Sequence, residues 1–180
     1  SSNMAKVFRV FVEKKKGNDI EARQLLEDLV STVGITALED LRLVNRYDAQ
    51  GLSKEEFDNA AKMILSEPNL DNIYTELQIP AGWKYFAAEF LPGQYDQRAD
   101  SAAQCIQLLT QGERPLVASA KVYLLKGGIT NAEFEKIKSY IINQVESREA
   151  SMEIPESLDI TADRPADIAR ISGFTAMSDD

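Results

Sequence analysis

The chain has 180 residues, 44% of them hydrophobic and 27% charged, which is typical of one ordinary globular domain or two small ones. With one cysteine, Cys105, and no histidine, it cannot form an internal disulfide, an imidazole-ligated zinc site or a catalytic pair that uses histidine as the base. The net charge of −9 and the lack of a long apolar run predict a cytoplasmic protein that binds neither nucleic acid nor membranes.

The first predicted element is a strand at residues 7–12, in which every second residue is apolar. A helix with one leucine-rich face follows, and then an extended segment at 41–51 that is either one strand or a hairpin. Ser53 and Glu56 have the spacing of a capping box, which predicts the start of a second helix. A closing strand is expected near residues 71–77.

The second part of the chain follows the same plan. A strand at residues 84–90 places Phe86 78 positions after Phe8 (86 − 8). Ser101 and Gln104 have capping-box spacing and predict the start of a helix that buries Cys105 as a small apolar residue.

A second extended segment follows at residues 116–126, again either one strand or a hairpin. Thr130 and Glu133 predict one more capped helix, and the last strand is expected near 148–154. The two capping boxes that open the second helix of each part lie 77 residues apart (130 − 53).

This order of elements predicts an α+β fold of two tandem ferredoxin-like halves with antiparallel sheets, related by a pseudo-twofold axis. The first half is expected at residues 4–78 and the second at 79–154. Residues 1–3, which precede Met4, are interpreted as a vector scar. Residues 155–180 are interpreted as the start of a linker to further domains, with a short helix at 166–171.

Several stretches together resemble the N-terminal region of large, single-chain phosphoribosylformylglycinamidine synthase. The similarity extends over nearly the whole chain from Met4 onward, and no single stretch is a general biochemical motif. The stretches that carry the resemblance are residues 10–17, 43–48, 66–68, 91–105 and 145–151.

The resemblance implies a non-catalytic domain similar to a fused dimer of the small PurS subunit. The full enzyme uses ATP, magnesium and glutamine-derived ammonia to convert formylglycinamide ribonucleotide into its amidine. The implied partners are the synthetase and glutaminase domains of the same parent chain, which this domain would hold in register for ammonia transfer. The family's histidine-containing motifs cannot occur in a chain without histidine, so no catalytic residue, cofactor or metal is expected here. A weak homodimer of the isolated chain is left open.

The polar loop 91–101 is the best candidate for an interface or a substrate-side contact, because loops carry binding residues more often than strands and helices do. Its candidate residues are Gln94, Asp96, Arg98 and Ser101. The plainer interpretation is a loop bonded to itself, with Ser101 capping the helix. Residues 45–48 are interpreted as making cross-strand hydrogen bonds around a hairpin or bend rather than as an interface.

The alternative function is a stand-alone ferredoxin-like regulatory module that binds a small ligand where its halves meet. An RNA-binding module of this fold would need a basic aromatic surface, which the acidic composition opposes. An autonomous carboxylate enzyme would need a distinctive pair of acids, and no pair stands out by its spacing.

Overall fold

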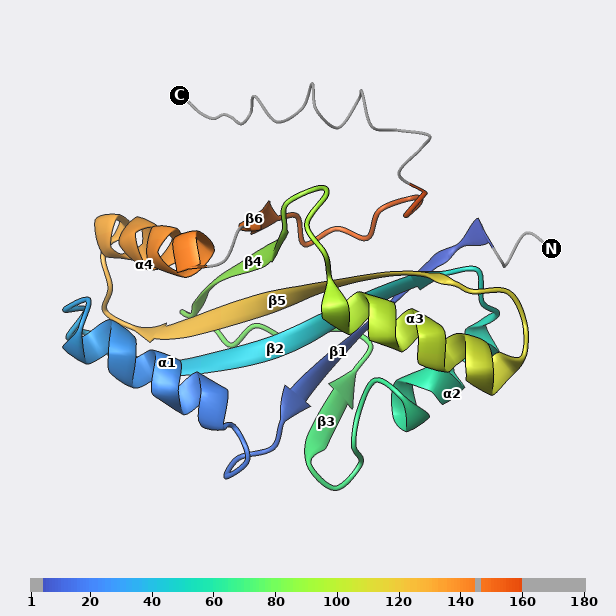
Figure 1. The fold of residues 1–180 in the computed structure, drawn as a ribbon. Helices are drawn as coiled ribbons and strands as arrows, with labels where there is room; N and C mark the ends of the chain where they lie inside the picture. Colours follow the sequence, from blue (N-terminus) through green and yellow to red (C-terminus); the bar gives the residue numbers. More distant parts are fainter. Residues whose placement is uncertain (1–4, 145–146, 160–180) are drawn as a thin grey trace.

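The strands join into one antiparallel sheet, which carries four helices in the part of the chain that the computed structural model describes, residues 5–144 and 147–159 (Figure 1). The six strands lie in the order β3-β1-β2-β5-β4-β6. In chain order the elements are β1 (Val7–Lys14), α1 (Ile20–Ser31), β2 (Leu38–Gln50), α2 (Lys54–Met63), β3 (Asp71–Tyr74), β4 (Lys84–Phe90), α3 (Gln97–Thr110), β5 (Leu116–Gly127), α4 (Asn131–Gln144) and β6 (Ser147–Ala150).

The two long strands β2 and β5 form the centre of the sheet. Each is a single continuous strand, which settles the choice between strand and hairpin left open by the sequence. They pair from Leu38 opposite Gly127 to Gln50 opposite Leu116, with one register shift between Leu38 and Asp40. The edge strands β3 and β6 have four residues each, so they are shorter than the closing strands expected from the sequence.

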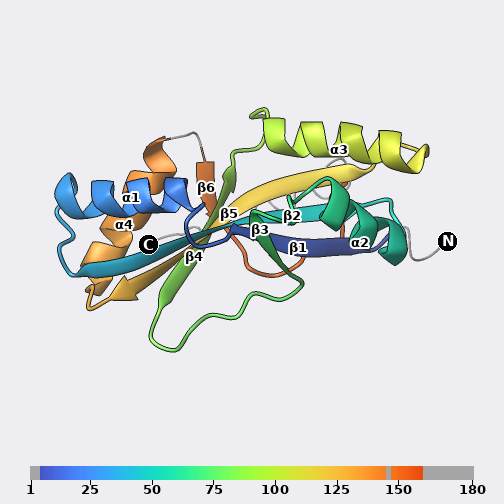
Figure 2. The ribbon, with the colours of Figure 1, turned by 90° about the horizontal axis from the view of Figure 1, so that it is seen from below.

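The four helices lie in two pairs, and each pair packs over one end of the sheet (Figure 2). One pair is α1 with α4, where Leu29 and Ile137 are fully buried and the Tyr140 hydroxyl donates to the Asp28 carboxylate. The other pair is α2 with α3, where Phe57 and Ile106 share a core. Each pair therefore combines one helix from before residue 79 with one helix from after it.

The opposite face of the sheet carries no helix in the described residues, and loops cover it instead. Its buried side chains include Phe11, Val44, Val122 and Leu124. The connector between β3 and β4 packs on them, and so does the segment after β6. The covering apolar residues are Leu77, Ile79, Trp83 and Met152.

Two of the three predicted capping boxes are confirmed, and the third is wrong. The Ser53 hydroxyl accepts from the Glu56 amide at 3.1 Å, and the Glu56 carboxylate accepts from the Ser53 amide at 3.0 Å. Thr130 and Glu133 make the same reciprocal contacts at 3.1 and 2.9 Å. The prediction fails at Ser101, which lies inside α3, because Asp96 caps this helix five residues earlier.

The prediction that Cys105 is buried is also wrong. Cys105 is exposed, because the buried face of α3 is formed by other residues of the helix. These are Ala99, Ala102, Ala103 and Ile106.

Among the described residues, no helix has both the length and the apolar character needed to cross a bilayer. The predicted vector scar at residues 1–3 and the predicted helix at 166–171 lie outside the described residues.

Candidate functional site

A groove of about 1020 Å³ opens on the helical face of the sheet, between the two helix pairs. Its floor is largely apolar and includes Leu43, Ala88 and Tyr123. Its walls come from α1, from the end of β4 with the following loop, from the first turns of α3 and from the end of α4. An apolar floor with a few polar groups around it is typical of binding sites.

Arg98 is the predicted site residue with the clearest place in this groove. It lines the wall, and its guanidinium donates to the hydroxyl of the buried Tyr47 at 3.2 Å. Burial lowers the pKa of Arg98, but the hydrogen bond to Tyr47 and the charges of Glu21 and Asp96 outweigh that effect and raise it. Arg98 forms no ion pair in the described part of the chain. Its remaining N–H groups are therefore able to donate hydrogen bonds to a bound acceptor.

Ser101 lines the same wall as Arg98, one turn further along α3. The structure therefore brings these two predicted residues together, although Ser101 is not the helix cap. Gln94 is exposed in the loop and does not line the groove.

Asp96 holds the start of α3 against β5. Its carboxylate accepts from the Ala99 amide at 3.0 Å, from the Ser119 amide at 3.1 Å and from the Ser119 hydroxyl at 2.8 Å. These contacts satisfy the helix N-terminus and leave the Asp96 carboxylate turned into the protein. The role of Asp96 is to position the wall that carries Arg98.

The other charges of the groove are mostly acidic or neutralised. Lys121 pairs with Glu21 at 2.7 Å, so its charge is compensated. Burial and the nearby Glu21 carboxylate raise the pKa of Tyr123 above its ordinary value, so its hydroxyl stays neutral over an even wider pH range than that of a free tyrosine. Among the residues that the structure describes, no group of three acidic or cysteine side chains is placed to hold a metal ion. The geometry of the groove supports binding of a hydrogen-bond acceptor by Arg98.

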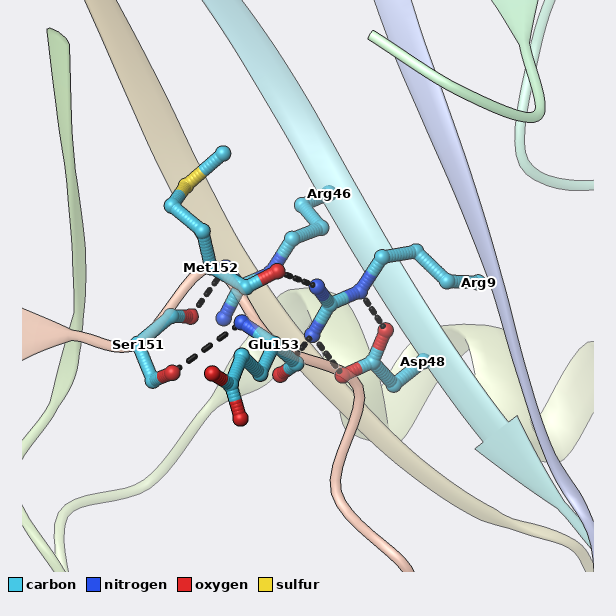
Figure 3. A network of polar contacts seen from close by, with 6 residues as sticks. All are labelled: Arg9, Arg46, Asp48, Ser151, Met152 and Glu153. Carbon is cyan, nitrogen blue, oxygen red and sulfur yellow. Dashed lines mark hydrogen bonds and ion pairs between the residues drawn. The ribbon is translucent and has the colours of Figure 1, made fainter.

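A second polar site lies on the helix-free face and contains two buried arginines (Figure 3). Arg9 of β1 and Asp48 of β2 form a two-point ion pair with distances of 2.7 and 2.9 Å. Arg46 lies beside them and donates to the carbonyl of Ser151 at 2.8 Å. The interpretation of residues 45–48 as cross-strand bonded is confirmed for Asp48, but the expected hairpin or bend is wrong, because β2 is continuous through these residues, and Arg46 bonds to the segment after β6 instead. Sequence reasoning missed Arg9, whose only signal was a charged residue inside an otherwise apolar strand.

No protein-family model matches the sequence, and no curated protein matches it.

Proposed function

We propose that this chain is a non-catalytic scaffolding domain of a phosphoribosylformylglycinamidine synthase, built from two tandem PurS-like halves related by a pseudo-twofold axis. The observation that carries the proposal is the repetition of strand registers within the sheet. The resemblance of the sequence to the N-terminal region of that enzyme supplies the family.

The pairing of the second three strands reproduces the pairing of the first three. Phe11 pairs with Tyr74 between β1 and β3, and Ala87 pairs with Ala150 between β4 and β6. Both positions are shifted by 76 (87 − 11 and 150 − 74). The same shift converts Phe11 opposite Arg46 into Ala87 opposite Val122. Such agreement supports two copies of one strand–helix–strand–helix–strand unit.

The helices support a fused dimer rather than two independent domains. Each helix pair takes one member from each proposed half, and β2 pairs with β5 along almost its full length. Either half alone would therefore expose the long edge of its central strand and the apolar faces of two helices. A subunit with such exposed surfaces would dimerise, and fusion of two copies gives the arrangement seen here.

A scaffolding role agrees with the groove and with the charge distribution. The buried polar groups of the helix-free face are used to hold the chain together, and Asp96 is used to fix α3. The groove offers Arg98 and the exposed aromatic rings of Phe90 and Tyr95 as a surface for a neighbouring domain. The synthetase and glutaminase domains are the proposed partners, with ATP and magnesium bound by the synthetase domain.

The test uses a phosphoribosylformylglycinamidine synthase from which the N-terminal domain has been deleted. We expect the 180-residue chain, without the truncated enzyme, to form no amidine from formylglycinamide ribonucleotide, ATP, magnesium and glutamine. When the 180-residue chain is added to the truncated enzyme, the glutamine-dependent rate should rise at least about tenfold over that of the truncated enzyme alone, because the domains regain their relative positions. The ammonia-dependent rate should rise less. Amidine formation by this chain alone, or the absence of both binding and activation, would contradict the proposal.

The groove favours a second candidate function, a regulatory module that binds a small carboxylate ligand. Arg98 would receive the carboxylate while Leu43 and Tyr123 contact the apolar part. Titration calorimetry with the twenty amino acids tests this candidate. Saturable heat that is abolished in Arg98→Ala and kept in Arg114→Ala would support it, because Arg114 is paired with Asp100 and does not line the groove. No heat with any of them would reject it.

A further inference from the structure

The last described segment of the chain, residues 151–159, runs back across the helix-free face of the sheet, and we call it the strap (Figure 1). It leaves β6 at one edge of the sheet and reaches the far end of β2. Met152 packs on the apolar residues of that face. Hydrogen bonds to Arg9, Arg46 and Gln50 also connect the strap to the strands.

The strap is held at its start through main-chain carbonyl groups (Figure 3). Arg46 donates to the carbonyl of Ser151 at 2.8 Å. Arg9 donates to the carbonyl of Met152 at 2.7 Å and to that of Glu153 at 3.2 Å. Three consecutive carbonyls are therefore bound by two arginines that belong to different strands.

The charges of this site explain why the carbonyls are needed. Arg9 and Arg46 are only 7% and 5% exposed, and the carboxylate of Asp48 is the acid in direct contact with Arg9. Burial and the nearby positive charge of Arg9 both lower the pKa of Arg46, so its charged form is destabilised there. A buried charge without acceptors is costly, and carbonyl oxygens supply the acceptors that one carboxylate cannot.

The far end of the strap is held by Gln50, the last residue of β2. The Gln50 side-chain oxygen accepts from the Leu158 amide at 2.6 Å and from the Ser157 hydroxyl at 3.3 Å. Its side-chain nitrogen donates to the carbonyl of Ala5 at 3.0 Å. One amide side chain thus joins the segment that enters the sheet to the segment that leaves it.

We propose that Arg9 and Arg46 form a docking site for main-chain carbonyls, which with Gln50 holds the strap on the sheet and fixes where the chain continues. Because the site binds carbonyl groups, it holds the first residues of the strap through their backbone rather than through their side chains. Leu158 is thereby held at the end of β2, where Gln50 also binds the carbonyl of Ala5.

Amide hydrogen exchange of the full chain, measured residue by residue by NMR, tests the proposal. In Arg46→Ala the strap amides near residues 151–153 should exchange at least about tenfold faster, whereas those of β5 should change less than about threefold. In Gln50→Ala the increase should appear at Leu158 and Asp159 and not at 151–153. The matched control is Glu153→Ala, which alters a strap side chain and keeps the carbonyl that Arg9 binds.

Each variant is decisive by itself. Unchanged strap exchange in Arg46→Ala would overturn the docking site. Gln50 lies at the end of the sheet, so Gln50→Ala is expected to fold even if Arg46→Ala does not. Unchanged exchange at Leu158 in Gln50→Ala would overturn the proposal that Gln50 holds the far end of the strap. Faster strap exchange in Glu153→Ala, matching that of Arg46→Ala, would show that side chains hold the strap and would also overturn the proposal.

Discussion

Arg9 and Asp48 are direct register partners across β1 and β2, and their side chains form a two-point ion pair on the helix-free face. The side chains are only 3% and 6% exposed. Two hydrogen bonds join the guanidinium and the carboxylate, so each buried charge has an opposite charge as its partner instead of lying unpaired inside the protein. Arg46 lies close enough for its pKa to respond to Arg9, so loss of Asp48 would affect two buried cations.

Replacing Asp48 by alanine should lower the free energy of unfolding by about 3 to 5 kcal/mol, because two buried guanidinium groups would lose their shared carboxylate. Urea denaturation followed by circular dichroism measures the change. The matched control is Asp58→Ala, which removes the exposed Lys54–Asp58 pair of α2. That pair is four residues apart on a helix surface and should contribute no more than about 0.5 kcal/mol. Equal losses in the two variants would contradict the role given to Asp48.

Gly127 ends β5 at the point where β2 changes register, and its backbone has a φ of +146°. A Cβ placed there would lie 2.2 Å from the carbonyl oxygen of Ala37. Gly127→Ala should therefore lower the free energy of unfolding by about 2 to 4 kcal/mol, since backbone must move to relieve the clash.

The neighbouring glycine provides the control for this prediction. A Cβ at Gly128 would meet nothing within 4 Å, so Gly128→Ala should change stability by no more than about 0.5 kcal/mol. Each variant adds one methyl group, and the two added groups lie at adjacent positions in the chain. If both glycines tolerate alanine equally in chemical denaturation, the close approach of Gly127 to Ala37 is not present in solution.

A chain limited to residues 4–78 should associate into dimers. It would keep β1, α1, β2, α2 and β3 but lose β5, which pairs with β2 from Leu38 to Gln50. The exposed edge of β2, together with the uncovered faces of α1 and α2, provides a surface that a second copy would cover. Sedimentation equilibrium should give twice the monomer mass. A stable, folded monomer would contradict the proposal that the two halves complete each other.

Periodicity predicted most elements because alternating apolar residues and capping boxes are local signals. Register is not local, and here the sequence was misleading. Matching the strands by their phenylalanines aligned Phe8 with Phe86, whereas the pairing registers align Val10 with Phe86. Pairing depends on contacts between strands distant in sequence, so single residue identities did not determine it.

The site was predictable only where one residue's position was decided by its neighbours in the chain. Arg98 and Ser101 lie one turn apart on the same face of a helix, so both side chains line the groove. The role of Asp96 depends on Ser119, which is 23 residues away in the sequence. The docking site for the strap depends on Arg9 meeting carbonyls more than 140 residues later, for which a single sequence has no signal.

Tyr123 should make the protein lose stability at alkaline pH. Burial, with a smaller effect of the Glu21 carboxylate, raises the pKa of Tyr123 above the value of about 10 that tyrosine has in an unfolded chain. The folded state then retains a proton that the unfolded state releases. The contribution to stability is complete below pH 10 and is lost as the pH rises from there toward the folded pKa, with a slope of up to about 1.4 kcal/mol per pH unit. Tyr123→Phe removes this titrating group, so the loss of stability per pH unit should be smaller by up to about 1.4 kcal/mol. The free energy of unfolding at pH 7 should change little. Urea denaturation at a series of pH values between 8 and about 11.5 checks the prediction, and parallel slopes for the two proteins would show that Tyr123 is not held neutral by burial.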